Sequence, residues 1–80
     1  MSDSPSCRRR VAGYNQFAKL VRKGKAVKVY LANDADGYFA ENIKRELRGT
    51  NIELETRYNS SDLATMAGVD VPTAVITETE

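Results

Sequence analysis

The stretch GYNQFAKLVRKGK, residues 13–25, decides how this chain folds and which surface it presents. On a helix its apolar side chains share one side, with the i, i+3, i+4, i+7 spacing typical of a helix that packs on a core. These are Tyr14, Phe17, Ala18, Leu20 and Val21. The opposite side, an arc of about 120°, carries two amides, three cations and no acid: Asn15, Gln16, Lys19, Arg22 and Lys23. Solvated helix faces usually mix charge signs, so this face suggests an anion supplied from outside the protein.

Length and charge bound the class of protein. Eighty residues with one cysteine form a single small domain without an internal disulfide. The sequence has neither an apolar run long enough for a membrane helix nor a secretory signal, so we expect a cytoplasmic protein, and nothing demands more than a monomer. Residues 1–32 hold eight basic residues against Asp3, a charge of +7, whereas residues 33–80 hold four against ten acids, a charge of −6. The basic half is suited to binding a polyanion. On charge alone, an asymmetry without any function is an equally good explanation.

Amphipathic and apolar segments separated by Gly, Asn and Asp predict alternating strands and helices. We expect residues 1–9 to form a flexible basic arm and residues 10–80 a single domain. The expected elements are an edge strand at 11–12, the helix above ending at Gly24, a buried central strand at 26–32, a helix at 38–48, an alternating strand at 52–58, a helix at 60–67 with Asn59 as its N-cap, and a strand at 73–77. This order predicts an α/β fold, a three-layer αβα sandwich with a small mixed sheet of about four strands.

The order of side chains along the polar face favours a surface that binds nucleic acid. The alternative is an ordinary solvated surface. Amides in the first turn match the donor–acceptor pairs of purine edges, and the free N–H groups there attract phosphate oxygens. Because a buried strand follows this short helix at once, an irregular RNA fits better than the major groove of DNA. We expect affinity to come from counterion release at residues 8–10, Lys19, Arg22, Lys23 and Lys25, with Lys28 a further candidate.

Three stretches carry a resemblance to a known family. VAGYNQFAKLVRKGKA at 11–26 resembles the N-terminal RNA-binding motif of the kink-turn-binding ribosomal protein family, the L-seven-Ae family, whose pattern is Gly-x-Asn-Glu-x-x-Lys. LATMAGVDVPTAV at 63–75 is similar to that family's second signature, and LANDAD at 31–36 matches a strand end of the form Ala-x-Asp-x-Asp. The resemblance covers residues 10–78 and is closest to the short bacterial members.

The resemblance implies a protein without cofactor or metal that grips a kink-turn, an RNA duplex bent at a bulge beside tandem G·A pairs, in ribosomal RNA, a riboswitch or another structured RNA. By position, Gly13 would let the backbone approach the RNA, Asn15 and Gln16 would read the purine edges, and Lys19 would contact bases or phosphate. The loop at 69–73 would pack apolar side chains on an unstacked bulge nucleotide. The expected RNA-binding residues are Gly13, Tyr14, Asn15, Gln16, Lys19, Arg22, Lys23, Val69, Asp70, Val71, Pro72 and Thr73.

Three departures from the family pattern bear on this expectation. Gln16 stands where many members have Glu, so its carbonyl accepts from guanine without charge assistance and binding is weaker. Asn33 and Gly37 replace an acid and a proline common in that turn, which leaves the shape of the turn open. Val71 occupies a loop position that is often Arg in archaeal and eukaryotic members, which removes one phosphate contact.

Two other functions stay open beside a non-enzymatic RNA-binding protein. One is a protein-interaction module of the same fold without RNA binding. The other is a Mg²⁺-dependent phosphatase in which Asp34 and Asp36 hold the ion, as in the nucleophile loop of haloacid-dehalogenase-type phosphatases. The chain has no histidine, and we favour turn formation and helix capping as the role of both acids.

Overall fold

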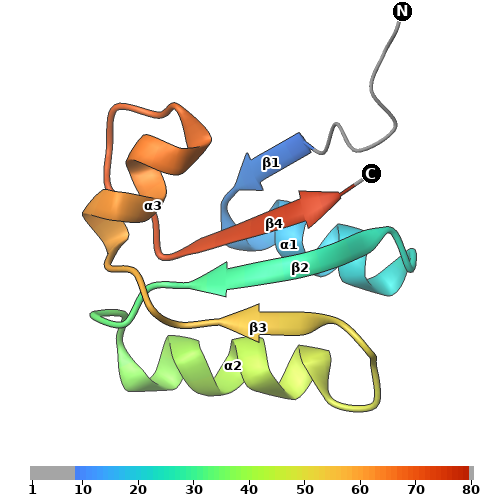
Figure 1. Cartoon of the computed structure of the whole chain (residues 1–80). Helices are drawn as coiled ribbons and strands as arrows, with labels where there is room; N and C mark the ends of the chain where they lie inside the picture. The colour runs from blue at the N-terminus through green and yellow to red at the C-terminus, as the bar shows by residue number, and fades with distance from the viewer. Residues whose placement is uncertain (1–8, 80) are drawn as a thin grey trace, which may run out of the picture.

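The computed structural model describes residues 9–79. Along that part of the chain the elements are β1 (Arg9–Ala12), α1 (Tyr14–Arg22), β2 (Ala26–Leu31), α2 (Gly37–Leu47), β3 (Glu53–Glu55), α3 (Ser60–Ala67) and β4 (Val75–Thr79). The strands form one mixed sheet in the order β1-β4-β2-β3, in which β2 and β3 are parallel and β4 is antiparallel to both of its neighbours (Figure 1). None of these helices has the length and apolar character needed to cross a membrane.

Helices cover both faces of the sheet, because β2 contributes apolar side chains to both. Val29 and Leu31 belong to the core cluster under α1 and α2, whereas Tyr30 and Ala32 belong to the cluster under α3. Successive strand residues point to opposite faces, so this division follows from the continuous apolar run of β2. The arrangement confirms the predicted αβα sandwich, with β1 at one edge and β2 inside the sheet.

Side-chain caps set where α2 and α3 begin. Asp36 accepts a hydrogen bond from the backbone N–H two residues on (3.2 Å), and Asn59 accepts one from the N–H of Asp62 (2.7 Å). Asp34 accepts from the N–H and the hydroxyl of Ser60 at 3.0 and 3.1 Å, which ties the turn after β2 to the start of α3. The structure therefore confirms capping of the following helix for Asp36, whereas Asp34 instead fastens the turn to α3, whose N-cap is Asn59.

The strand predicted at 52–58 is wrong in length, since β3 has only three residues. Leu54 packs against the core under α1 and α2, whereas Tyr58 packs against the core under α3. In an unbroken strand both side chains would face the same side of the sheet. The chain must therefore leave the sheet after Glu55 to reach the opposite layer, which ends the strand.

The terminal strands are also displaced from their predicted positions. The last strand begins at Val75 instead of Thr73, because the N–H of Thr73 donates to the carbonyl of Ser60 (3.4 Å) and not to a neighbouring strand. The first strand begins at Arg9, so this residue belongs to the sheet and not to the predicted arm. The remainder of that arm, residues 1–8, lies outside the described residues.

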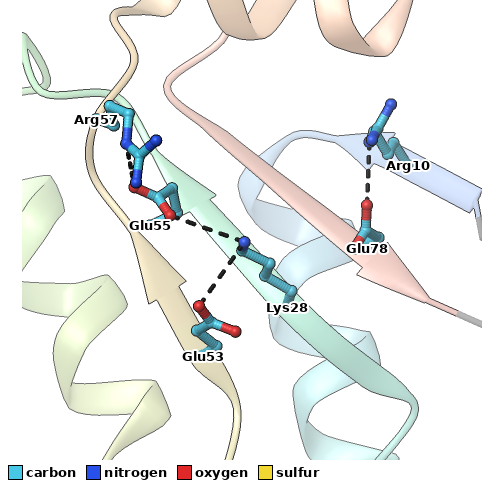
Figure 2. Close-up of polar contacts among 6 residues, drawn as sticks. All are labelled: Arg10, Lys28, Glu53, Glu55, Arg57 and Glu78. Atoms are coloured by element: carbon cyan, nitrogen blue, oxygen red, sulfur yellow. Dashed lines mark hydrogen bonds and ion pairs between the residues drawn. The ribbon is translucent and has the colours of Figure 1, made fainter.

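Ion pairs link neighbouring strands of the sheet (Figure 2). They lie on the face that carries Tyr30, since the Lys28 amine is 5.1 Å from the centroid of the Tyr30 ring. Arg10 pairs with Glu78 at 3.1 Å, and Lys28 lies 3.8 Å from Glu53 and 3.7 Å from Glu55. Glu55 also pairs with Arg57 at 3.2 Å. Acids of the C-terminal half therefore compensate Arg10 and Lys28 within the fold, and a contribution of these two cations to RNA binding stays a prediction.

The surroundings of Lys28 predict a pH dependence of stability. Desolvation lowers the pKa of Lys28, but the charges of Tyr30, Glu53, Glu55 and Glu78 outweigh it and raise this pKa above 10.5. The charged amine therefore contributes stability that is fully present below its unfolded pKa and is lost as the pH rises through the folded pKa.

We expect the free energy of unfolding of Lys28→Met to fall below that of the wild type at neutral pH, and the difference to shrink at alkaline pH. Denaturant titrations between about pH 8 and about pH 11.5 measure this difference. A difference that stays constant over the whole range would mean that Lys28 stabilises the fold through its aliphatic stem and not through its charge.

Candidate nucleic-acid interface

The polar side of α1 faces solvent along its whole length. Phe17, Ala18 and Val21 are buried beneath the helix. The side chains predicted for the opposite side are all exposed: Asn15, Gln16, Lys19, Arg22 and Lys23. Lys19, Lys23 and the following Lys25 form no ion pair with any residue between 9 and 79. This side of α1, the polar face from here on, therefore holds the predicted amides and unpaired lysines in one continuous strip.

One cation of the polar face has an acidic partner that the sequence did not reveal. The Arg22 guanidinium lies 3.2 Å from the Glu46 carboxylate of α2, and the Arg22 side chain remains 69% exposed. The polar face is thus partly compensated, contrary to the expectation of an all-cationic strip. Exposed ion pairs of this kind contribute about 0–1 kcal/mol, so Arg22 can exchange Glu46 for another anion at little cost.

Gly13 joins the start of α1 to the start of β4. Its N–H donates to the carbonyl of Val75 at 3.1 Å, and its backbone has φ +104° and ψ 149°. That conformation is essentially restricted to glycine. No atom lies within 4 Å of the position that a Cβ would occupy, and no side chain caps the helix. The first turn of α1 therefore offers its N–H groups on an open surface.

The bond between Gly13 and Val75 places the loop at 68–74 beside the start of α1. The loop is held by hydrogen bonds from the N–H of Val69 to the carbonyl of Ala64 (3.0 Å) and from the Thr73 hydroxyl to the carbonyl of Val75 (3.2 Å). Between these anchors the side chain of Val71 is 66% exposed. Val69, Asp70 and Pro72 are exposed as well, and Thr73 is half-buried. The two segments predicted to bind RNA, far apart in the sequence, thus meet at one end of the sheet.

A shallow depression of 460 Å³ runs along α1, lined by Tyr14, Asn15, Ala18, Lys19, Arg22 and Lys23. Tyr14 is the half-buried member of this lining. The Tyr14 ring centroid lies 5.6 Å from that of Phe17 and 5.7 Å from that of Phe39, so the ring belongs to the packing between α1 and α2. Its contact with RNA stays a prediction, whereas Asn15 and Lys19 are exposed at the surface of the depression.

Tyr38 is a candidate that the sequence analysis missed. Its side chain is 76% exposed at the start of α2. Phe39, Ile43 and Leu47 recur every four residues along α2, and Tyr38 lies outside that apolar stripe. An aromatic residue off the apolar stripe of a helix is the signal that could have identified it.

Comparison with known proteins shows what the fold resembles. No protein-family model matches the chain, and neither does any curated protein. A solved protein of unknown function from Bacillus halodurans has a TM-score of 0.81 and 21% identity, over 90% of this chain and 72% of that one. A 15.5 kD RNA-binding protein from Giardia lamblia has a TM-score of 0.80 and 25% identity, over 90% of this chain and 61% of that one. The chain therefore shares the fold of an RNA-binding protein and spans about three fifths of its length.

Proposed function

We propose that this chain is a non-enzymatic RNA-binding protein of the cytoplasm that recognises kink-turns in ribosomal RNA, a riboswitch or another structured RNA. The observation that carries the proposal is the hydrogen bond between Gly13 and Val75, because it joins the polar face of α1 to the exposed apolar loop. A bent RNA needs both: a surface that follows its backbone and a place for the base that leaves the stack. The fold shared with the Giardia RNA-binding protein supports the same proposal.

Base recognition falls to the first turn of α1. Asn15 and Gln16 are exposed there, beside backbone N–H groups that no side chain caps. A side-chain amide donates and accepts at once, which is the pattern that a purine edge requires. The adjacent N–H groups of the helix terminus are suited to a phosphate oxygen. Asn15 and Gln16 therefore read the G·A pairs, and the loop receives the bulged nucleotide on Val71.

The lysines that follow bind the phosphate backbone of the RNA. Lys19 and Lys23 lie one helical turn apart on the polar face, and Lys25 lies in the turn between α1 and β2. Their unpaired state within the described part of the chain means that a phosphate displaces no protein carboxylate. These lysines supply affinity that depends on salt and not on sequence.

A gel-shift titration of the full chain tests the proposal, with a kink-turn hairpin and a straight duplex of the same composition over a series of salt concentrations. We expect tight binding to the kink-turn and weaker, strongly salt-dependent binding to the straight duplex. Equal affinity for the two RNAs would refute kink-turn recognition. The absence of binding to either RNA would favour a protein-interaction module of the same fold.

Replacing Lys23 with alanine should weaken binding modestly to both RNAs. Removing one phosphate contact lowers the slope of log K against log salt by about one unit or less. The matched control is Lys44→Ala, since Lys44 is an exposed lysine two residues from Glu46, about 200° around α2 from the side that meets α1. An equal change of slope in the control variant would mean that both lysines act only through net charge.

A further inference from the structure

We propose that Tyr38 is a stacking site for an unpaired nucleobase and that it extends the RNA interface from α1 onto α2. This inference rests on the proposed function and adds to it a second base-binding position, distinct from the loop at 68–74. Among the large apolar and aromatic residues of the described chain, Tyr38 has the highest exposure, at 76%. A tyrosine combines a flat apolar ring with a polar tip, which suits it to interfaces, so an exposed tyrosine near the amides of α1 is a candidate for a base contact.

Contacts between α1 and α2 place Tyr38 at the same end of the molecule as the amides. The Tyr14 and Phe39 rings meet at the first turns of the two helices, with centroids 5.7 Å apart. Arg22 and Glu46 meet at their last turns, 3.2 Å apart. The two helices therefore run parallel and side by side, and Tyr38 lies level with the first turn of α1.

The direction of the tyrosine follows from the helical repeat. Tyr38, Asn42 and Glu46 are spaced by four residues, so they form one row along α2 that turns by about 40° at each step, and Tyr38 lies about 80° around the helix from Glu46. Glu46 reaches across to Arg22, which shows that the Glu46 end of this row borders α1. Tyr38 lies at the other end, on the outer side of the row, because the buried Ile43 and Leu47 lie beyond Glu46 in the opposite direction. Asn15 and Arg22 are seven residues apart and follow the flank of α1 that faces α2. A base that leaves the RNA beside Asn15 can therefore pass over the groove between the helices and lie on Tyr38 at the outer surface of α2.

The backbone of Tyr38 is held in place. Its N–H donates to the Asp36 carboxylate at 3.2 Å, and the Asp36 carbonyl accepts from the N–H of Ala40 at 2.9 Å. The ring therefore projects from a capped helical turn and not from a loose loop. Stacking on such a platform costs little ordering of the protein, because only the side-chain torsions must be restricted.

Charge around Tyr38 selects the kind of ligand. Asp36 precedes it by two residues, and Glu41 lies three residues on, hence next to it on the helix surface. The basic residues of α2, Lys44 and Arg45, lie in its last turn. Two carboxylates repel phosphate but do not oppose the neutral face of a base. The RNA backbone therefore follows the lysines of α1, and only a base reaches α2.

Binding of the full chain to the kink-turn hairpin tests this inference with two variants. Because every base offers a π-face and stacking dominates single-strand recognition, we expect Tyr38→Ala to weaken binding at least about fivefold. Tyr38→Phe keeps the ring and should bind within about twofold of the wild type. Neither change removes a phosphate contact, so the slope of log K against log salt should stay that of the wild type.

A second measurement identifies the base. Each unpaired nucleotide of the hairpin is replaced in turn by an abasic residue, and both the wild type and Tyr38→Ala are titrated. We expect one position at which the abasic change weakens the wild type but not the variant, as a double-mutant cycle between contacting groups requires. Thermal melting should show both variants folded, since the side chain is largely exposed.

The outcomes separate this inference from the function on which it rests. Wild-type preference for the kink-turn together with unchanged affinity of Tyr38→Ala overturns the stacking site and leaves the proposed function intact. A loss that Tyr38→Phe shares with Tyr38→Ala would assign the effect to the hydroxyl and would also overturn stacking. A wild type that does not distinguish the kink-turn from the straight duplex refutes the proposed function, and the stacking site with it.

Discussion

Replacing Asn15 with alanine is expected to weaken binding to a kink-turn hairpin by about 1–3 kcal/mol. The amide of Asn15 is exposed in the first turn of α1, where it can donate to and accept from one purine edge at once. Alanine removes both of these hydrogen bonds, so the donor and the acceptor of the purine edge are left without partners in the complex. The loss should therefore fall on discrimination, and a hairpin in which Watson–Crick pairs replace the tandem G·A pairs should be bound almost as before.

Two comparisons make this result specific. Asn51→Ala removes an equally exposed amide from the turn after α2, at the end of that helix far from Tyr38, and should leave both affinities unchanged. Fluorescence anisotropy with the two hairpins at one fixed salt concentration measures all four combinations of variant and RNA. Equal losses on the two RNAs for Asn15→Ala would contradict base reading at this position and would leave only a general contribution to affinity.

Replacing Gly13 with alanine is expected to lower the free energy of unfolding by about 1–3 kcal/mol. The cause is the backbone and not crowding, because φ is +104° and no atom lies within 4 Å of the new Cβ. To relieve the strain, the residue must rotate, which breaks its hydrogen bond to Val75 and separates α1 from the loop at 68–74. RNA affinity should therefore fall in the fraction of protein that remains folded.

Gly37→Ala is the matched control for Gly13→Ala. Gly37 is the first residue of α2, and the position that its Cβ would occupy is open, as at Gly13. Unlike Gly13, Gly37 does not have a positive φ. Alanine there should leave stability unchanged or raise it by about 0.4–1 kcal/mol, because it restricts the unfolded chain. Urea titrations of the three proteins measure the difference. A Gly13→Ala variant as stable as the wild type would mean that this turn adapts to a side chain without strain.

The structure divides the basic residues of the N-terminal half into two groups. Arg10 and Lys28 lie in β1 and β2 and pair with Glu78, Glu53 and Glu55, and Arg22 pairs with Glu46 of α2. Lys19, Lys23 and Lys25 lie on and after α1 and pair with no acid among residues 9–79. The charge asymmetry of the sequence overstates the surface available to an anion, but the part that remains is concentrated beside the amides.

Local features were readable from the sequence because their causes are local. The amphipathic pattern of α1 follows from a repeat of 3.6 residues, and the start of α3 follows from the Asn59 cap and its end from Gly68 with φ +73°. The interior position of β2 follows from a continuous apolar run. Each depends on residues within one or two turns of the chain, so no tertiary information was needed.

Whatever depends on residues far apart in the sequence was decided by the tertiary structure. Periodicity gives the direction of a side chain relative to its own helix or strand, but not the element that will lie opposite. For this reason the pairing of Arg22 with Glu46 and the early end of β3 could not be derived from the pattern. The sequence alone determined that α1 has an apolar side and a polar side with amides and cations. Only the packing of β4 against β1 and α1, through the bond between Gly13 and Val75, brought the loop at 68–74 beside that polar face.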